Sequence, residues 1–229
     1  VQTLPSMTAE DALEFCARLP VRTVFDIGPG SGVHLREFRN RGKEVFALCP
    51  HSVEEFEEVT FRGRFPEILS TPAWKGDRFD LIWSSHCLEH QENPQAFLKA
   101  LHSLCHPQSF LAITVPPRKD RIVSGHLTLW NAGLLLQHLI LAGFDCSRAG
   151  VKSYGYNVSV VLPYEPYPET LVRNQRGDIE LSRIGRYLPQ SIVQDPRGSY
   201  DGWIFESSWQ VEGSQPPLQE PPTSFQLSG

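Results

Sequence analysis

Short apolar runs alternate with amphipathic stretches along most of the chain. Branched and aromatic runs that end at glycine or proline predict buried strands, and apolar residues at helical spacing predict helices. The expected strands cover residues 22–28, 43–50, 59–64, 79–85, 109–116, 144–153 and 156–163, and the expected helices cover 8–19, 33–42, 51–59, 94–105 and 130–144. This alternation predicts an α/β fold with a doubly wound, mostly parallel sheet and right-handed crossovers.

The character of the chain changes at Tyr164, where prolines become frequent and periodicity fades. We therefore expect an α/β domain over residues 1–163. Residues 164–211 keep many large apolar side chains and predict a packed appendage, which lies either on the sheet domain or on a second copy of the chain in a homo-oligomer. Residues 212–229 are rich in proline, glutamine, serine and glycine and predict a flexible tail.

Composition excludes several classes of protein. The 229 residues carry a net charge of -5 and no run of lysine and arginine, which argues against a nucleic-acid partner. The five cysteines are odd in number and scattered, so reduced, buried thiols are expected. No apolar stretch reaches the length of a membrane span and no signal pattern precedes the first helix, so we expect no membrane partner and a cytoplasmic location.

The segment VFDIGPGSG contains the most informative turn, at the end of the first expected strand. In a doubly wound sheet, ligands bind at the carboxyl ends of the strands. Gly28, Gly30 and Gly32 allow a tight turn and leave no Cβ between the backbone and a ligand. A dinucleotide fingerprint would need glycine or alanine at position 33, where this chain has Val33, so a nicotinamide or flavin cofactor is disfavoured.

The pattern D-x-G-x-G-x-G, formed by Asp26 and the three glycines, resembles motif I of the class I S-adenosylmethionine-dependent methyltransferases. Residues 79–116 are similar to the family's fourth strand, Leu-Glu-His segment, helix and fifth strand, and residues 125–145 resemble the helix before its last strands. The resemblance implies a Rossmann-like sheet of seven strands with an antiparallel last strand. It also implies S-adenosylmethionine as cofactor.

The same resemblance assigns residues to the cofactor site. Asp26 and the backbone of Gly28 and Gly30 would face the methionine end of the cofactor. The end of the fourth strand would line the site with Ser84, Ser85 and His86.

Two acids of the family's cofactor site are replaced in this chain. The acid that takes the ribose hydroxyls is replaced by Cys49, and a thiol is a poor acceptor. The acid that meets the adenine amine is replaced by Arg64, although Glu67 lies near. Both changes predict weakened or altered cofactor binding.

The segment from His86 to His90 also matches H-x-x-E-H, the inverted zinc-protease motif. That motif needs one helix that carries both histidines and a distant acid ligand. Here the segment directly follows a buried strand, and the methyltransferase resemblance already accounts for Leu-Glu-His. No metal site is therefore expected.

His90 and His126 are the candidate general bases, because imidazole titrates near neutrality and can accept the proton of a hydroxyl acceptor. A purely structural role is an equal alternative for each. The expected function is methyl transfer to a small-molecule acceptor, and the segments 125–145 and 156–163 resemble methyltransferases that modify sugars and glycans. The alternative is a non-catalytic binding or scaffold protein of the same fold that has lost its cofactor acids.

Overall fold

The computed structural model describes residues 8–50, 60–172, 174, 176–177 and 179–209. The helix expected over 51–59 and the tail expected over 212–229 lie outside the described residues. None of the helices in the described ranges combines the length and the apolar character that a membrane crossing needs.

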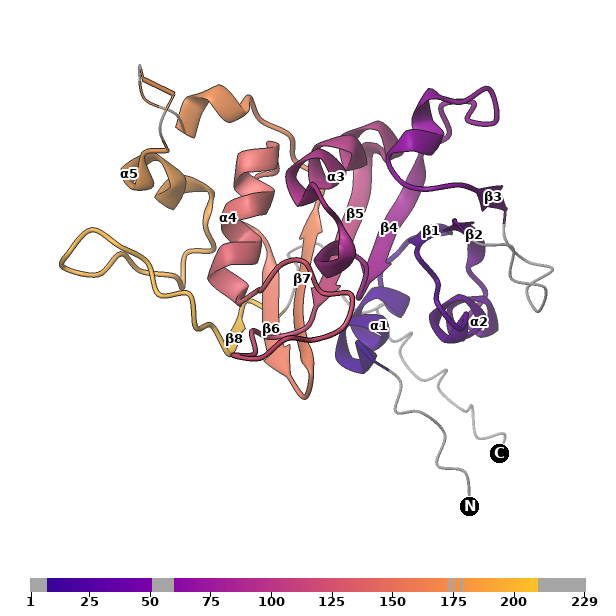
Figure 1. Ribbon diagram of the computed structural model, residues 1–229, viewed down its shortest axis with the longest axis horizontal. Coiled ribbons are helices and arrows are strands. Elements are labelled where there is room, and N and C mark those ends of the chain that lie inside the picture. Colours follow the sequence, from indigo (N-terminus) through magenta and orange to yellow (C-terminus); the bar gives the residue numbers. More distant parts are fainter. Residues whose placement is uncertain (1–7, 51–59, 173, 175, 178, 210–229) are drawn as a thin grey trace, which may run out of the picture.

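One sheet forms the centre of the molecule, with strand order β3-β2-β1-β4-β5-β7-β6-β8 (Figure 1). The strands are β1 (Thr23–Ile27), β2 (Glu44–Cys49), β3 (Phe61–Arg62), β4 (Phe79–Ser85), β5 (Cys105–Val115), β6 (Gly150–Tyr154), β7 (Asn157–Pro163) and β8 (Glu206–Ser207). Strands β1 to β5 are parallel, whereas β7 runs antiparallel to both of its neighbours, β5 and β6. The mostly parallel sheet and the antiparallel last strand of the α/β domain are thus confirmed. An eighth strand comes from the appendage, because β8 pairs antiparallel with the edge strand β6.

The helices are α1 (Glu10–Ala17), α2 (Val33–Asn40), α3 (Pro94–Ala100), α4 (Ala132–Ala142) and α5 (Leu181–Ile184), with short 3₁₀ turns at Glu67–Ser70, Leu88–His90, Leu101–Leu104, Glu169–Val172 and Gly185–Tyr187. Asparagine side chains start two of them. Asn93 Oδ1 accepts a hydrogen bond from Ala96 N at the start of α3, and Asn131 Oδ1 accepts one from Leu134 N at the start of α4. These bonds satisfy backbone donors that have no partner inside the helix.

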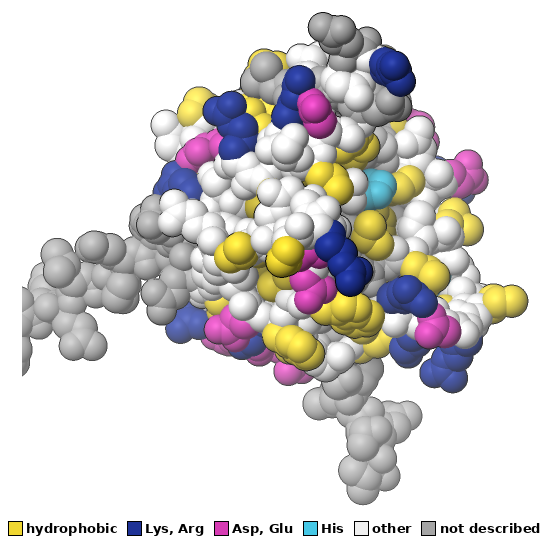
Figure 2. Space-filling model, turned by 90° about the vertical axis from the view of Figure 1, so that its left-hand side faces the viewer, with side chains coloured by type: hydrophobic (Ala, Val, Ile, Leu, Met, Phe, Trp, Pro, Cys, Tyr) yellow, Lys and Arg dark blue, Asp and Glu magenta, His cyan; other side chains and the backbone are white. Residues whose placement is uncertain are grey.

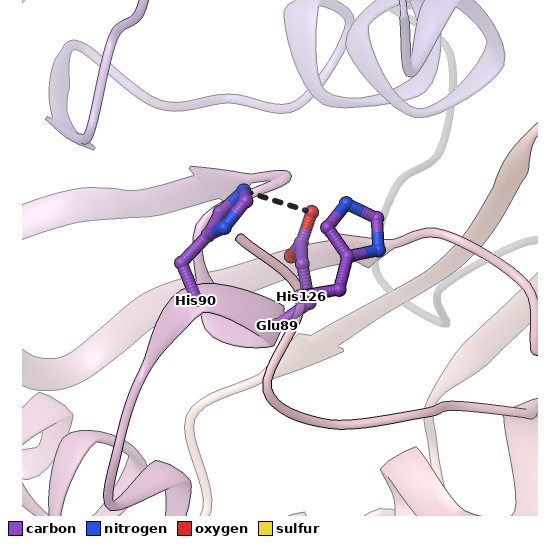
Figure 3. Close-up of side chains that lie close together, drawn as sticks. All are labelled: Glu89, His90 and His126. Carbon is purple, nitrogen blue, oxygen red and sulfur yellow. Dashed lines mark ion pairs between the residues drawn. The ribbon is translucent and has the colours of Figure 1, made fainter. Parts of the chain in front are cut away.

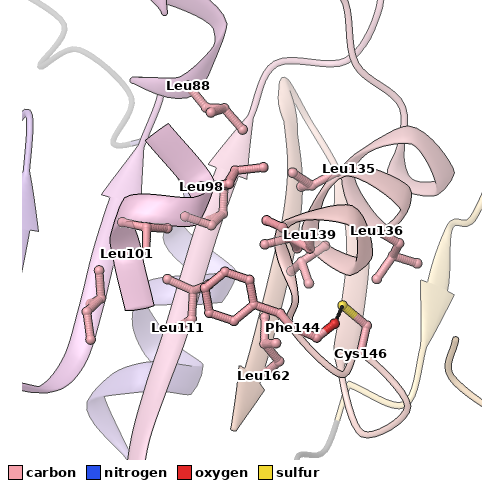
Figure 4. Close-up of a cluster of buried hydrophobic side chains, with 14 of the residues drawn as sticks. Leu88, Leu98, Leu101, Leu111, Leu135, Leu136, Leu139, Phe144, Cys146 and Leu162 are labelled. Carbon is pink, nitrogen blue, oxygen red and sulfur yellow. Dashed lines mark hydrogen bonds between the residues drawn. The ribbon is translucent and has the colours of Figure 1, made fainter. Parts of the chain in front are cut away.

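Helices cover both faces of the sheet, as a doubly wound fold requires. On one face, α1 and α2 bury Leu13 and Phe38 against Val24 of β1. On the other face, α3 and α4 pack leucines from both helices against β5 and β7, with the Phe144 ring in the same layer (Figure 4). Because strands β1 and β4 and the second half of β5 lie between two apolar layers, they are buried along nearly their whole length.

The described part of the appendage packs against α4 and the β6 edge of the sheet. Val172, Ile184 and Leu188 are buried in the same apolar cluster as α4. The Tyr187 ring stacks on the Tyr167 ring with centroids 3.8 Å apart. The appendage and the α/β domain are therefore joined by a continuous apolar layer.

Not all large apolar groups of the appendage are covered. Trp203 and Phe205 are 63% and 79% exposed, although the sequence predicts that both pack. Figure 2 looks onto the appendage face and shows hydrophobic side chains scattered among charged ones. Phe205 is held through its backbone, because its carbonyl accepts a hydrogen bond from Ser153 N at 2.7 Å.

The strand order places the ends of β1, β2 and β4 together. Strand β1 pairs with β2 on one side and with β4 on the other, so the chain reverses direction across the sheet at this strand. This is the switch point at which doubly wound sheets bind ligands. The glycine turn after β1 lies at this point.

Truncation of the chain after Pro163 should destabilise the α/β domain. The cut removes the apolar side chains that cover α4, each of which contributes about 1.5–3 kcal/mol when fully buried. We expect a lower melting temperature or loss of solubility, measured by thermal unfolding and gel filtration. The control is truncation after Gln210, which leaves every described contact in place and should cost little. A 1–163 chain that is as heat-resistant as the full chain would contradict this packing.

A point variant tests the contact between α4 and the appendage with a smaller change to the chain. Gly133 N donates a hydrogen bond to Gly202 O, and a Cβ on Gly133 would lie 2.6 Å from the Gly202 Cα. Alanine normally stabilises a helix by up to about 1 kcal/mol relative to glycine. In α4, Gly133→Ala should lower stability instead.

Candidate functional site

The turn after β1 is held open by three glycines in the left-handed region of backbone space. Gly28, Gly30 and Gly32 have φ angles of 78°, 54° and 70°. Gly28 N donates to Leu48 O at 3.0 Å, which fixes the turn beside the end of β2. A Cβ on Gly28 would lie 3.1 Å from the Cys87 Sγ atom, whereas a Cβ on Gly30 would meet nothing within 4 Å. The backbone at Gly30 is therefore free for close approach by a ligand.

Asp26 lies beneath this turn and is 1% exposed. Its Oδ2 atom is buried without a hydrogen-bond partner. Desolvation of the carboxylate raises the pKa of Asp26 to about 7. A cationic group bound at this point would supply the missing partner and lower that pKa.

A pocket of about 480 Å³ opens beside the turn. It is lined from β1, β2, the segment after β3 and the segment after β4, and includes Gly28, Leu48, Pro50, Arg64, Cys87 and His90. The structure thus brings three of the expected site residues, Gly28, Arg64 and His90, to one cavity. Its walls come from the ends of four neighbouring strands, as expected for a ligand site in this fold.

The far side of this pocket lacks the expected carboxylate. Cys49 ends β2 and is 7% exposed, between the pocket-lining residues Leu48 and Pro50. Arg64 and Glu67 are both exposed and both line the pocket. A cation and an anion are therefore available on this side, but no acid stands at the end of β2.

The end of β4 places Ser84, Ser85 and His86 beside the turn. Both serines are buried, and His86 has a positive φ of 51°. His86 Nε2 lies 2.9 Å from Asn157 Oδ1. Burial opposes the charged imidazole, but the Glu89 carboxylate and Asn157 outweigh it and hold the pKa of His86 above its usual range.

His90 and His126 meet at the rim of the pocket. Their ring centroids are 5.1 Å apart, and the rings are nearly perpendicular. The Glu89 side chain lies between the two imidazoles (Figure 3), with its Oε1 atom 3.7 Å from His90 Nε2. The two candidate bases therefore share one place, although they are far apart in sequence.

Comparison with known proteins identifies the fold. Residues 7–146 match the family described as the methyltransferase domain. The chain belongs to the methyltransferase-domain family. No curated protein matches this chain.

Solved structures with this methyltransferase fold are distant in sequence. One is an S-adenosylmethionine-dependent methyltransferase from Archaeoglobus fulgidus, with TM-score 0.54 and 16% identity over 69% of this chain and 92% of the other. A TehB-like methyltransferase from Corynebacterium glutamicum has TM-score 0.51 and 16% identity, over 70% and 90%. The 1,6-didemethyltoxoflavin N1-methyltransferase from Burkholderia thailandensis, with S-adenosylhomocysteine bound, has TM-score 0.50 and 18% identity, over 68% and 79%.

S-adenosylmethionine is the cofactor of the methyltransferase family, and most of this site fits it. The partnerless Asp26 oxygen suits its ammonium group, and the open face of Gly30 suits its carboxylate end. The position of Cys49 is the misfit, because the cofactor's ribose hydroxyls need an acceptor there.

Sequence reasoning missed Cys87 and Gln91, which both line the pocket of this methyltransferase domain. Gln91 Nε2 donates to the Cys87 carbonyl at 2.9 Å and so closes the turn after β4. Burial raises the pKa of the Cys87 thiol to about 12, so this thiol is neutral. The available signal was position, since Cys87 lies two residues after the end of β4.

Asp26→Asn should stabilise the ligand-free protein while abolishing cofactor binding. The pKa of Asp26 is about 7 in the folded state against 3.8 for a free side chain, so the folded protein holds this proton more tightly. Stability must then fall as pH rises from about 4 to above 7, by at most about 4 kcal/mol. Asparagine does not titrate, so the advantage of the variant should grow over that range in denaturant titrations at several pH values.

The matched control is Asp80→Asn. Partial burial opposes the charge of Asp80, but hydrogen bonds from Thr23 N, Arg22 N and His106 outweigh it and hold its pKa low. The Asp80 carboxylate therefore stabilises the folded state at pH values above the usual pKa of an aspartate. This stabilisation is lost as the pH falls and the carboxylate becomes protonated. Asp80→Asn should therefore destabilise at neutral pH, opposite in sign to Asp26→Asn. Equal signs for the two variants would contradict the assignment of Asp26.

Proposed function

We propose that this methyltransferase domain transfers a methyl group from S-adenosylmethionine to a small-molecule acceptor. The observation that carries the proposal is the glycine turn over a buried, partnerless Asp26 carboxylate at the switch point of the sheet. A protein that bound no ligand at this point would be more stable with a neutral side chain in place of the Asp26 carboxylate.

The residues on the cofactor side of the site bind and orient S-adenosylmethionine. The Asp26 carboxylate holds the ammonium group, the turn from Gly28 to Gly32 receives the carboxylate end, and the apolar residues Leu48 and Pro50 pack on the base. When bound, the cofactor supplies an electrophilic methyl group on a sulfonium sulfur. The remaining task of the chain is to hold the acceptor in line with it, which is a proximity effect.

The acceptor side is the rim formed by His90 and His126. For a hydroxyl acceptor, this side of the site would also have to take up the hydroxyl proton. Each imidazole has a nitrogen that can accept it. His90 is the better placed of the two for the pocket, because it lines the cavity directly.

A sugar or glycan hydroxyl is the acceptor class that we infer. The inference rests on the resemblance of residues 125–145 and 156–163 to methyltransferases that modify such molecules. A methyltransferase of similar fold takes a small heterocycle, 1,6-didemethyltoxoflavin, which supports a small acceptor more generally.

A non-catalytic scaffold is the second candidate, and Cys49 favours it. Without an acid at the end of β2, a charge-assisted hydrogen bond to the ribose is missing. The two proposals differ in one measurable property, which is affinity for S-adenosylhomocysteine.

Calorimetric titration with S-adenosylhomocysteine tests the proposal, with Gly30→Val as the decisive variant. A Cβ at Gly30 would meet no protein atom within 4 Å, so the fold should persist. Because we place the carboxylate end of the cofactor on this turn, a valine side chain there should abolish binding. Gly42→Val is the matched control, because Gly42 has a similar positive φ of 75° and open space but lies after α2, outside the pocket. Absence of binding in the unmodified chain favours the scaffold, and equal affinity in the Gly30 variant removes the turn from the site.

Cys49→Asp should tighten cofactor binding. A carboxylate at the end of β2 can accept hydrogen bonds from both ribose hydroxyls, and a charge-assisted bond contributes about 1.5–3 kcal/mol at best. Titration with S-adenosylhomocysteine should show a correspondingly lower dissociation constant. Cys49→Ser controls for loss of the thiol and should change little. Weaker binding in the aspartate variant would show that the ribose is held elsewhere.

A further inference from the structure

The Glu89 side chain is an unusual group to find buried. It is completely inaccessible to solvent, and neither of its carboxylate oxygens accepts a hydrogen bond. A buried carboxylate of this kind is strongly unfavourable unless a positive charge lies beside it. Its nearest polar neighbours are imidazole nitrogens, His86 Nδ1 at 3.4 Å and His90 Nε2 at 3.7 Å from Oε1.

The hydrogen bonds of these histidines show which nitrogen is free. His90 Nδ1 lies 2.7 Å from the Gly125 carbonyl oxygen, which can only accept, so Nδ1 carries the proton of the neutral ring. The lone pair of His90 Nε2 then faces Glu89. Asn157 Oδ1 likewise accepts from Ala9 N, so His86 Nε2 donates to it. A lone pair of His90 that faces the Glu89 carboxylate calls for a cation between the two groups.

Backbone hydrogen bonds fix the third imidazole in the same place. Leu127 N donates to Glu89 O at 2.8 Å, and Thr128 N donates to the same oxygen at 3.3 Å. His126 therefore belongs to a loop that is tied to the Glu89–His90 turn on both sides. One ligand atom from each of Glu89, His90 and His126 lies within 4.8 Å of the other two.

We propose that Glu89, His90 and His126 bind a divalent transition-metal ion such as Zn²⁺ or Mn²⁺. Two imidazoles and one carboxylate are a donor set typical of such ions. Bonds of 2.0–2.2 Å in a tetrahedron separate ligand atoms by roughly 3.4 Å. The Glu89–His90 pair, at 3.7 Å, is close to that separation, and the other pairs lie within 4.8 Å. The His90 Nδ1 bond to Gly125 is the second hydrogen bond that ligating histidines usually make. The sequence offered only the H-x-x-E-H segment, and the loop fold adds His126.

The site also has an open side. His90 is 44% exposed at its side chain and lines the pocket beside the glycine turn, so an acceptor oxygen can reach a bound ion. Such an ion would hold the acceptor hydroxyl and lower its pKa, in place of direct proton removal by an imidazole. This role rests on the proposed methyl transfer, whereas metal binding itself does not.

The test measures metal binding directly on the full chain. The purified protein is stripped with a chelator and titrated with ZnCl₂ and with MnCl₂ by calorimetry, and metal content after dialysis is measured by mass spectrometry. We expect one equivalent per chain. Glu89→Gln, His90→Ala and His126→Ala should each weaken binding by at least about 100-fold, and Gly125→Ala by about 10- to 100-fold, because its Cβ would lie 3.1 Å from His90 Nδ1.

Glu44→Gln and His106→Gln are the matched controls, since they remove the same residue types outside the cluster and should leave binding unchanged. Thermal unfolding and titration with S-adenosylhomocysteine show that each variant is folded. Less than a stoichiometric equivalent of metal, or equal affinity in the ligand variants and the controls, overturns the proposal and leaves a protonated His86 as the partner of Glu89. Metal binding without affinity for S-adenosylhomocysteine would uphold this site and count against the proposed function alone.

Discussion

The burial of two carboxylates near the carboxyl ends of the parallel strands is the constraint on which this site depends. Asp26 lies under the glycine turn and Glu89 under the pocket rim, and both have oxygen atoms without hydrogen bonds. Desolvated carboxylates destabilise a folded chain until a cation or a proton compensates them. The site is therefore electrostatically incomplete at two points, one where we propose that the cofactor binds and one where we propose that the acceptor binds.

The rest of the fold offsets this cost and keeps the two groups in place. Strand β1 lies between β2 and β4 with apolar layers on both faces, so the Asp26 backbone cannot shift toward solvent. The Glu89 carbonyl is bonded to the loop that carries His126, so its side chain stays with the imidazoles. Rigidity here has a chemical use, because preorganised groups bind a ligand without a further cost of ordering.

The sequence predicts the fold well because the signals are local and periodic. Strand β4 and helix α4 are long apolar runs with clear ends, and Asp26 with its glycines marks the turn between β1 and α2. The approach of His126 to Glu89 could not be predicted, because it depends on a long loop held by backbone bonds rather than on any spacing in the chain. The β8 strand was missed for a related reason. Two residues carry no periodicity, and the pairing of β8 with β6 is a tertiary contact.

The choice between an enzyme and a scaffold depends on how Cys49, Asp26 and Glu89 affect the stability of the ligand-free protein. Cys49 buries a thiol, which is compatible with a fold that binds nothing. Asp26 and Glu89 are different, because a scaffold would be more stable with neutral side chains of similar size at both positions. Groups that destabilise the empty protein and lie at or just after the ends of neighbouring strands are the pattern expected when function opposes stability. The missing acid at the ribose end is therefore outweighed by two buried carboxyl groups, and ligand binding is the interpretation that accounts for all three residues.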